Sequence, residues 1–144
     1  MTSELTSELT VRADLVRRIE ELLDEHSPET TERLDFLRAR FDAGLAWVHF
    51  PSGLGGLGLA RPCQSYVEQR LASAGAPDND SRRNGIGLGM AAPTILAFGT
   101  DEQKQTFLRP LWTREEVRCH PSSEPGPRPP LAAASTRAGR ARRP

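Results

Sequence analysis

The chain has 144 residues, of which 37% are apolar, and its formal net charge is zero, so it is long enough for one domain with a buried core. The charge is uneven: residues 121–144 hold five Arg against one acidic residue, hence +4, and because the total is zero the rest carries −4. This balance argues against a nucleic-acid-binding core, and no apolar run is long enough to span a membrane.

The first third of the chain predicts a leader and two helices. The N-terminus is acidic and lacks the apolar region of a secretory signal. Residues 1–10 repeat Ser-Glu-Leu-Thr and are predicted to form a flexible leader. Apolar residues at helical spacing then predict amphipathic helices over 11–25 and 29–43, the second ended by Gly44. We interpret the charges on both helices as solvated faces.

The middle of the chain predicts loops around one further helix. A short apolar run over 45–50 leads into a glycine-rich loop over 51–58. A third helix is predicted from Pro62 to Ala74, and the polar, turn-forming residues 77–84 predict another loop.

Residues 85–112 organise the rest of the chain. Residues 85–98 are apolar nearly all round, which predicts a buried helix, and Gly99 is predicted to end it in the left-handed conformation. Thr100 and Gln103 form a capping-box pattern at the start of the next helix. That helix carries one apolar stripe: Phe107, Leu108, Leu111 and Trp112. The predicted fold is therefore all-α, with four to five helices.

The motif Gly53-x-Gly55-x-x-Gly58 matches the dinucleotide-binding fingerprint, and Asp78 follows at the expected separation. The fingerprint needs a strand before it and a helix beginning inside it, but Pro51 interrupts the approach and no alternation of strands and helices follows. We favour a glycine loop that turns between helices over a Rossmann fold.

Cysteine and histidine residues give no clear reactive cluster. Cys63 and Cys119 are far apart in sequence, which favours free thiols in a cytoplasmic protein and predicts no metal site. Cys119 and His120 are a possible nucleophile pair, but no acid that would orient the histidine is evident. His49, in an apolar run, is interpreted as a packed side chain, and His26 as a helix-end residue.

Several short segments, in this order and spacing, resemble acyl-CoA dehydrogenases. The glycine loop carries Pro51-x-x-x-Gly55-Gly56-x-Gly58, and the later segments read Leu-Ala-Ser-Ala-Gly-Ala-Pro over 71–77 and Phe-Gly-Thr-Asp-Glu-Gln-Lys over 98–104. The segment 117–126 resembles the loop of that family that contacts flavin, whose centre is Ser/Thr-Glu-Pro-Gly-Ala-Gly-Ser-Asp. The resemblance extends from about residue 10 to Ala138.

The resemblance implies that 11–118 form the N-terminal helical domain of such an enzyme and that FAD is the cofactor. It assigns cofactor contacts to five residues of the flavin loop: His120, Ser123, Glu124, Pro125 and Gly126. The family pattern then breaks, since Pro-Arg-Pro-Pro at 127–130 replaces Ala-Gly-Ser-Asp. We interpret residues 119–144 as a degraded flavin-loop segment and a disordered tail, which holds six of the 12 prolines.

The implied chemistry is α,β-dehydrogenation of an acyl-CoA thioester, in which a glutamate removes the α proton and hydride passes from the β carbon to flavin N5. No residue here matches that glutamate, so the resemblance assigns no catalytic residue and leaves open whether the chain is an enzyme on its own. We expect an incomplete, inactive fragment, from a truncated or degraded gene copy or a sequencing error from about codon 118. The alternative is a non-enzymatic helical module that forms a homo- or hetero-oligomer with dehydrogenase subunits.

Overall fold

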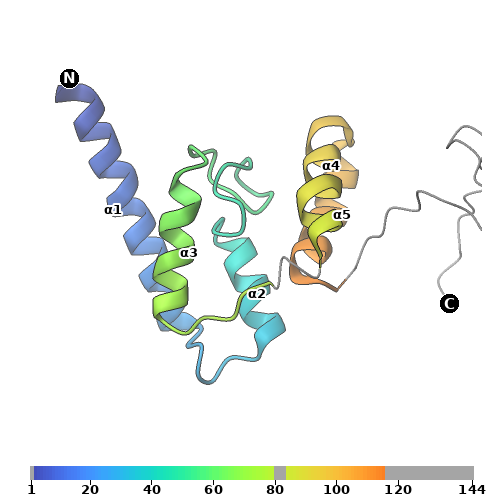
Figure 1. Ribbon diagram of the computed structural model, residues 1–144, viewed down its shortest axis with the longest axis horizontal. Helices are drawn as coiled ribbons and strands as arrows, with labels where there is room; N and C mark the ends of the chain where they lie inside the picture. Colours follow the sequence, from blue (N-terminus) through green and yellow to red (C-terminus); the bar gives the residue numbers. More distant parts are fainter. Residues whose placement is uncertain (1, 80–83, 116–144) are drawn as a thin grey trace, which may run out of the picture.

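The computed structural model describes residues 2–79 and 84–115, and within these ranges it is helical and contains no strand, which confirms the all-α prediction. An isolated bridge joins Ser52 to Gly56 in the glycine loop. In Figure 1, α1 and α3 lie side by side, α4 and α5 form a second pair, and α2 lies between the two pairs. The helical elements are α1 (Thr2–Glu25), α2 (Arg33–Asp42), α3 (Cys63–Ser73), the π-helical turn η1 (Gly87–Ala91), α4 (Ala92–Phe98) and α5 (Asp101–Thr113).

Helices α1 and α2 begin at other residues than predicted. Helix α1 begins at Thr2, so residues 2–10 are helical and no break separates a leader from the helix. Helix α2 begins at Arg33, because Glu32 caps it by accepting a hydrogen bond from the Leu34 N–H at 2.9 Å. The residues before Glu32 form a turn instead, closed by a bond from the Thr31 N–H to the Ser27 carbonyl at 2.9 Å.

The first core cluster joins α1, α2 and α3. Leu15, Ile19 and Leu22 of α1, spaced four and three residues apart, point into it, as the apolar periodicity predicts. The segment that follows α2 contributes two further side chains. Its buried members are Leu15, Ile19, Leu22, Phe36, Leu45, Val48, Val67 and Leu71.

The second core cluster is aromatic and centres on Trp47. The indole ring stacks on Phe50 at 4.6 Å between centroids and meets Trp112 of α5 edge-on at 5.1 Å. The glycine loop folds back onto this segment, because the Trp47 N–H donates to the Gly55 carbonyl at 2.8 Å. A Cβ on Gly56 would lie 2.1 Å from the Phe50 carbonyl oxygen, so only glycine fits there.

The prediction of a buried helix over 85–98 is wrong. The segment divides into η1 and α4, and three of its large side chains face outward: Ile86 is 42% exposed, Met90 56% and Phe98 85%. Gly99 is extended at φ −71° rather than left-handed, and a Cβ there would lie 2.5 Å from the Ile95 carbonyl oxygen, so close approach explains the glycine.

The start of α5 is as predicted. The Thr100 hydroxyl accepts from the Gln103 N–H at 3.2 Å, and the Gln103 side chain accepts from the Thr100 N–H at 2.9 Å, which completes the capping box. Leu108, Leu111 and Trp112 of the apolar stripe are buried, and Phe107 is half-buried.

Candidate functional site

The five candidate flavin contacts, His120 and residues 123–126, lie outside the described residues, as does Cys119. They follow Glu115, the last described residue, at the end of α5. The part of the candidate site that the structure describes is therefore the end of α5, together with the groups that hold it in place.

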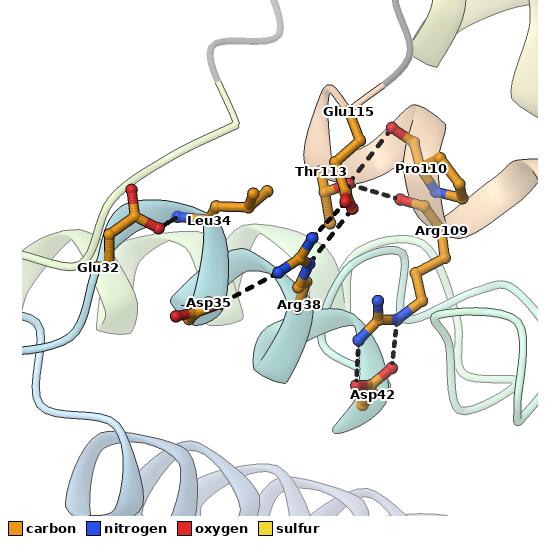
Figure 2. A network of polar contacts seen from close by, with 9 residues as sticks. All are labelled: Glu32, Leu34, Asp35, Arg38, Asp42, Arg109, Pro110, Thr113 and Glu115. Carbon is orange, nitrogen blue, oxygen red and sulfur yellow. Dashed lines mark hydrogen bonds and ion pairs between the residues drawn. The ribbon is translucent and has the colours of Figure 1, made fainter. Parts of the chain in front are cut away.

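Two ion pairs join α2 to α5 and to the residues that follow it (Figure 2). The Arg109 guanidinium donates two hydrogen bonds to the Asp42 carboxylate, at 2.9 and 2.6 Å. Just past the end of α5, Arg38 donates to both oxygens of Glu115 and also contacts Asp35 at 3.2 Å. Planar guanidinium–carboxylate pairs of this kind fix orientation as well as distance. The two ion pairs therefore hold the last turn of α5 in a defined position on α2.

Side chains also contact carbonyl groups in the last turns of α5, near the helix end where backbone carbonyls run out of helical partners. The Thr113 hydroxyl lies 3.1 Å from the Arg109 carbonyl oxygen and 2.8 Å from Glu115 Oε2, and its single proton can serve one acceptor at a time. The Asn84 amide donates to the Leu111 carbonyl at 3.0 Å. Hydrogen bonds from Arg38 first, and from Thr113 second, hold the pKa of the Glu115 carboxyl below its ordinary value.

A buried cation, Arg40, lies against the second core cluster. Arg40 of α2 is 2% exposed, donates from Nε to the Leu45 carbonyl at 3.0 Å, and pairs with Glu68 of α3 at 2.5 Å. Burial lowers the pKa of Arg40, and the charge of Glu68 opposes that effect. The sequence interpretation of the α2 charges as a solvated face is therefore wrong for this residue.

An apolar face lies open on η1 and α4. Its most exposed members are Met90 and Phe98, and Gly85 and Gly89 on the same segment have open space where a Cβ would lie. Phe98 borders a shallow groove of about 380 Å³ between α4 and α5. The groove is lined by Ala91, Thr94, Ile95, Phe98, Gly99, Gln103 and Phe107. Such a face, on a segment interrupted by a π-helical turn, is a candidate contact surface.

The remaining candidates do not form a reactive site among the described residues. No helix begins inside the glycine motif, because α3 starts only at Cys63, and Gly55 packs against the Phe41 ring instead. The His49 ring packs edge-on against Phe50, its Nδ1 has no hydrogen-bond partner, and burial first, then the charge of Arg61, lowers its pKa.

Residues 2–79 and 84–115 contain neither a candidate metal site nor a helix that could span a membrane. No group of three or more His, Cys, Asp or Glu side chains there could hold a metal ion, and Cys63 has a free thiol. No helix in that part of the chain has the length and apolar character required to cross a bilayer.

Comparison with known proteins gives a consistent result. The sequence profile described as acyl-CoA dehydrogenase, N-terminal domain, matches residues 6–115. The chain is 35% identical to acyl-CoA dehydrogenase IpdE1 of Mycobacterium tuberculosis over 67% of its own length and 24% of that protein. It is 28% identical to a probable acyl-CoA dehydrogenase of Bacillus subtilis over 84% of its length and 19% of that protein.

The human short-chain specific acyl-CoA dehydrogenase is 33% identical over 66% of the chain and 23% of its own length. The chain thus spans a quarter or less of the length of these curated relatives. No solved structure matches.

Proposed function

Since the chain belongs to the acyl-CoA dehydrogenase family through its N-terminal domain, we propose that it forms the helical layer of a FAD-dependent enzyme that dehydrogenates an acyl-CoA thioester between its α and β carbons. The observation that carries this proposal is the match over residues 6–115, a range that takes in nearly all of the described residues. When bound, FAD supplies the hydride acceptor. We also place the protein in the cytoplasm, a proposal that the free thiol of Cys63 supports.

The donor chemistry of the candidate flavin segment fits FAD only in part. Ser123 and Gly126 bring backbone N–H groups and a hydroxyl, and these would hold the cofactor. The residues that follow, Pro127, Pro129 and Pro130, have no N–H to donate. No residue here matches the glutamate base of the family. These 144 residues should therefore bind FAD weakly, and turnover should need groups that they do not supply.

Flavin titration of the purified 144-residue protein tests this proposal. We expect a colourless protein that binds FAD below stoichiometry, followed by quenching of flavin fluorescence. A yellow protein with stoichiometric FAD would contradict it. The matched variant carries Pro127→Ala, Arg128→Gly, Pro129→Ser and Pro130→Asp, which restores the missing N–H groups, and it should bind FAD more tightly. Equal binding by the two proteins would show that the prolines are not the cause.

Sequencing the gene from the codon of Glu116 to well past that of Pro144 tests the origin of the altered segment. A corrected reading that restores Gly-Ala-Gly-Ser-Asp would make the prolines an artefact. If the prolines stand, the altered loop belongs to the protein, and the flavin titration decides what it still binds.

A second candidate function is a helical module that docks on a complete dehydrogenase subunit. The exposed apolar side chains Met90 and Phe98 favour it, because large apolar side chains left open to water can mark contact sites. The test mixes the purified chain with a purified full-length acyl-CoA dehydrogenase from the same organism and measures binding by sedimentation. Binding that Phe98→Ser abolishes supports docking through this face. Absence of binding by the unaltered chain excludes the module for that partner.

A further inference from the structure

Helix α5 ends at a residue in a sparsely populated backbone conformation. Its C-cap, Arg114, has φ +66° and ψ 21°, and within residues 2–79 and 84–115 no other non-glycine residue has a positive φ. Glycine is usual at such a left-handed cap, because a Cβ crowds the backbone there. A residue with a Cβ keeps this conformation only where its surroundings fix it.

The residues on both sides of Arg114 are fixed. Before it, Thr113 is 2% exposed, and its hydroxyl lies within hydrogen-bond distance of the Arg109 carbonyl oxygen. After it, Glu115 accepts hydrogen bonds from Arg38 of α2 and lies 2.8 Å from the Thr113 hydroxyl. Figure 2 shows Arg38 reaching across from α2 to the Glu115 carboxylate, so the chain is anchored to a second helix directly after the left-handed residue.

We propose that Arg38 is a positioning residue: by holding Glu115 on α2, it keeps Arg114 in the left-handed conformation and so sets the direction in which the chain leaves α5. The inference deepens the proposed function and rests on it in one respect. The chain that leaves α5 here leads in the sequence to the candidate flavin contacts His120 and Ser123–Gly126, which lie outside the described residues.

The neighbouring ion pair provides a matched control. Arg109 and Asp42 join the same two helices, with a guanidinium and a carboxylate of similar geometry. Among the described residues, however, no hydrogen bond joins the Arg109 side chain to Glu115. The Arg109 backbone carbonyl oxygen accepts from the Thr113 hydroxyl, and the substitution of the side chain leaves that carbonyl in place. Arg109→Gln therefore weakens helix docking while it leaves the Arg38–Glu115 pair in place.

Nuclear magnetic resonance of the full 144-residue chain, without flavin, tests the proposal at Arg114. A residue with positive φ gives a strong nuclear Overhauser effect between its own amide and Hα protons. We expect this signal at Arg114 in the unaltered protein and in Arg109→Gln, and the loss of at least half of its intensity in Arg38→Gln and Glu115→Ala. Melting temperatures, measured in parallel, separate the local change from a general loss of stability.

A nitroxide label on Cys119, in a Cys63→Ala background, tests the direction of the chain. We expect the set of amide signals that it broadens to be the same in the unaltered protein and in Arg109→Gln, and to differ in Arg38→Gln. The proposal is overturned if the Arg114 signal and the broadened set stay the same in Arg38→Gln, or if Arg109→Gln changes both equally. Neither readout uses FAD, so failure here leaves the flavin titration to judge the proposed function.

Discussion

Arg40 of α2 lies over the face of Trp112 of α5, with its guanidinium carbon 5.0 Å from the centroid of the indole ring. Arginine is seldom fully buried, because removing its charge from water is costly unless hydrogen bonds and favourable contacts offset that cost. Here the Leu45 carbonyl, the Glu68 carboxylate and the indole ring surround the cation. One side chain thus joins α2, α3, α5 and the apolar segment after α2.

Replacement of Arg40 should destabilise the fold. We expect Arg40→Ala to lower the free energy of unfolding by about 2–4 kcal/mol, since it opens space beside Trp112 and leaves the Leu45 carbonyl without its donor. Arg40→Met fills most of that space. It should lower the free energy of unfolding by less, about 1–3 kcal/mol, because the Leu45 carbonyl still loses its donor. Urea unfolding followed by circular dichroism measures both. An equal or larger loss for the methionine variant would mean that charge, rather than packing, dominates.

The capping box at the start of α5 should contribute measurably to stability. Thr100→Ala removes the acceptor for the Gln103 N–H and should lower the free energy of unfolding by about 1 kcal/mol. The control is Gln105→Ala, an exposed position on the same helix, which should change it by less than about 0.5 kcal/mol. If both variants unfold at the same urea concentration, the box does not stabilise α5.

Two glycines should differ sharply in their tolerance of alanine. In Gly56→Ala the new Cβ would meet the Phe50 and Trp47 carbonyl oxygens, so we expect a loss of about 1–3 kcal/mol as the loop shifts. Gly85→Ala adds a Cβ in open space and should be close to neutral. Thermal unfolding of both proteins is the measurement, and similar melting temperatures would show that the loop adapts at little cost.

Acid should remove the contribution of the Arg38–Glu115 pair. The groups that face Glu115 are the cations Arg38 and Arg109, whose own partners are Asp35 and Asp42. The folded-state pKa of Glu115 lies below its ordinary value of 4.5. Its contribution is therefore present above that value and is lost as pH falls through the lowered pKa. The effect should be small, because both side chains are partly exposed and solvent screens the pair.

Urea unfolding at about pH 7 and about pH 3 measures this loss. The difference in stability between the unaltered protein and Arg38→Gln should be present at the higher pH and shrink at the lower one. In a Glu115→Gln background, the effect of Arg38→Gln should change less between the two pH values, because only the contact with Asp35 then remains. A difference that persists unchanged in acid would exclude Glu115 as the titrating partner.

The exposed apolar face should make the chain associate. Phe98→Ser removes the most exposed large apolar side chain and should reduce concentration-dependent association in sedimentation velocity runs. The free energy of unfolding should change by less than about 0.5 kcal/mol, because Phe98 is largely outside the core. The control is Ala97→Ser, also exposed on α4. Association that Phe98→Ser leaves unchanged would place the contact elsewhere.

Local signals in the sequence were sufficient for part of the fold. The Thr100–Gln103 box was predictable because both partners lie within one turn, and the α1 face because its apolar residues repeat at helical spacing. The exposure of Met90 and Phe98 was not predictable, because an apolar run looks the same whether its own domain or another polypeptide covers it.

Contacts between residues far apart in the chain could not be predicted from the sequence. Asp42 and Arg109 are 67 residues apart, and nothing in the pattern around either one pairs them. Arg40 stands in a run of charged residues that looks like a solvated face, and only tertiary packing places it over the ring of Trp112. The left-handed Arg114 likewise carries no sequence signal, since glycine is the residue that normally indicates such a cap.

The Asn84 amide that donates to the Leu111 carbonyl also has a chemical consequence over time. Asn84 stands directly before Gly85, and an asparagine followed by glycine is the one that most readily cyclises and loses its amide nitrogen in water. In the folded chain the side chain is 2% exposed and held by its hydrogen bond, which keeps it from the geometry that the reaction needs. Once converted to aspartate, it would place a carboxylate against the carbonyl oxygen it now serves. The side chain can therefore react in the fraction of molecules that is unfolded, and the resulting covalent change opposes refolding.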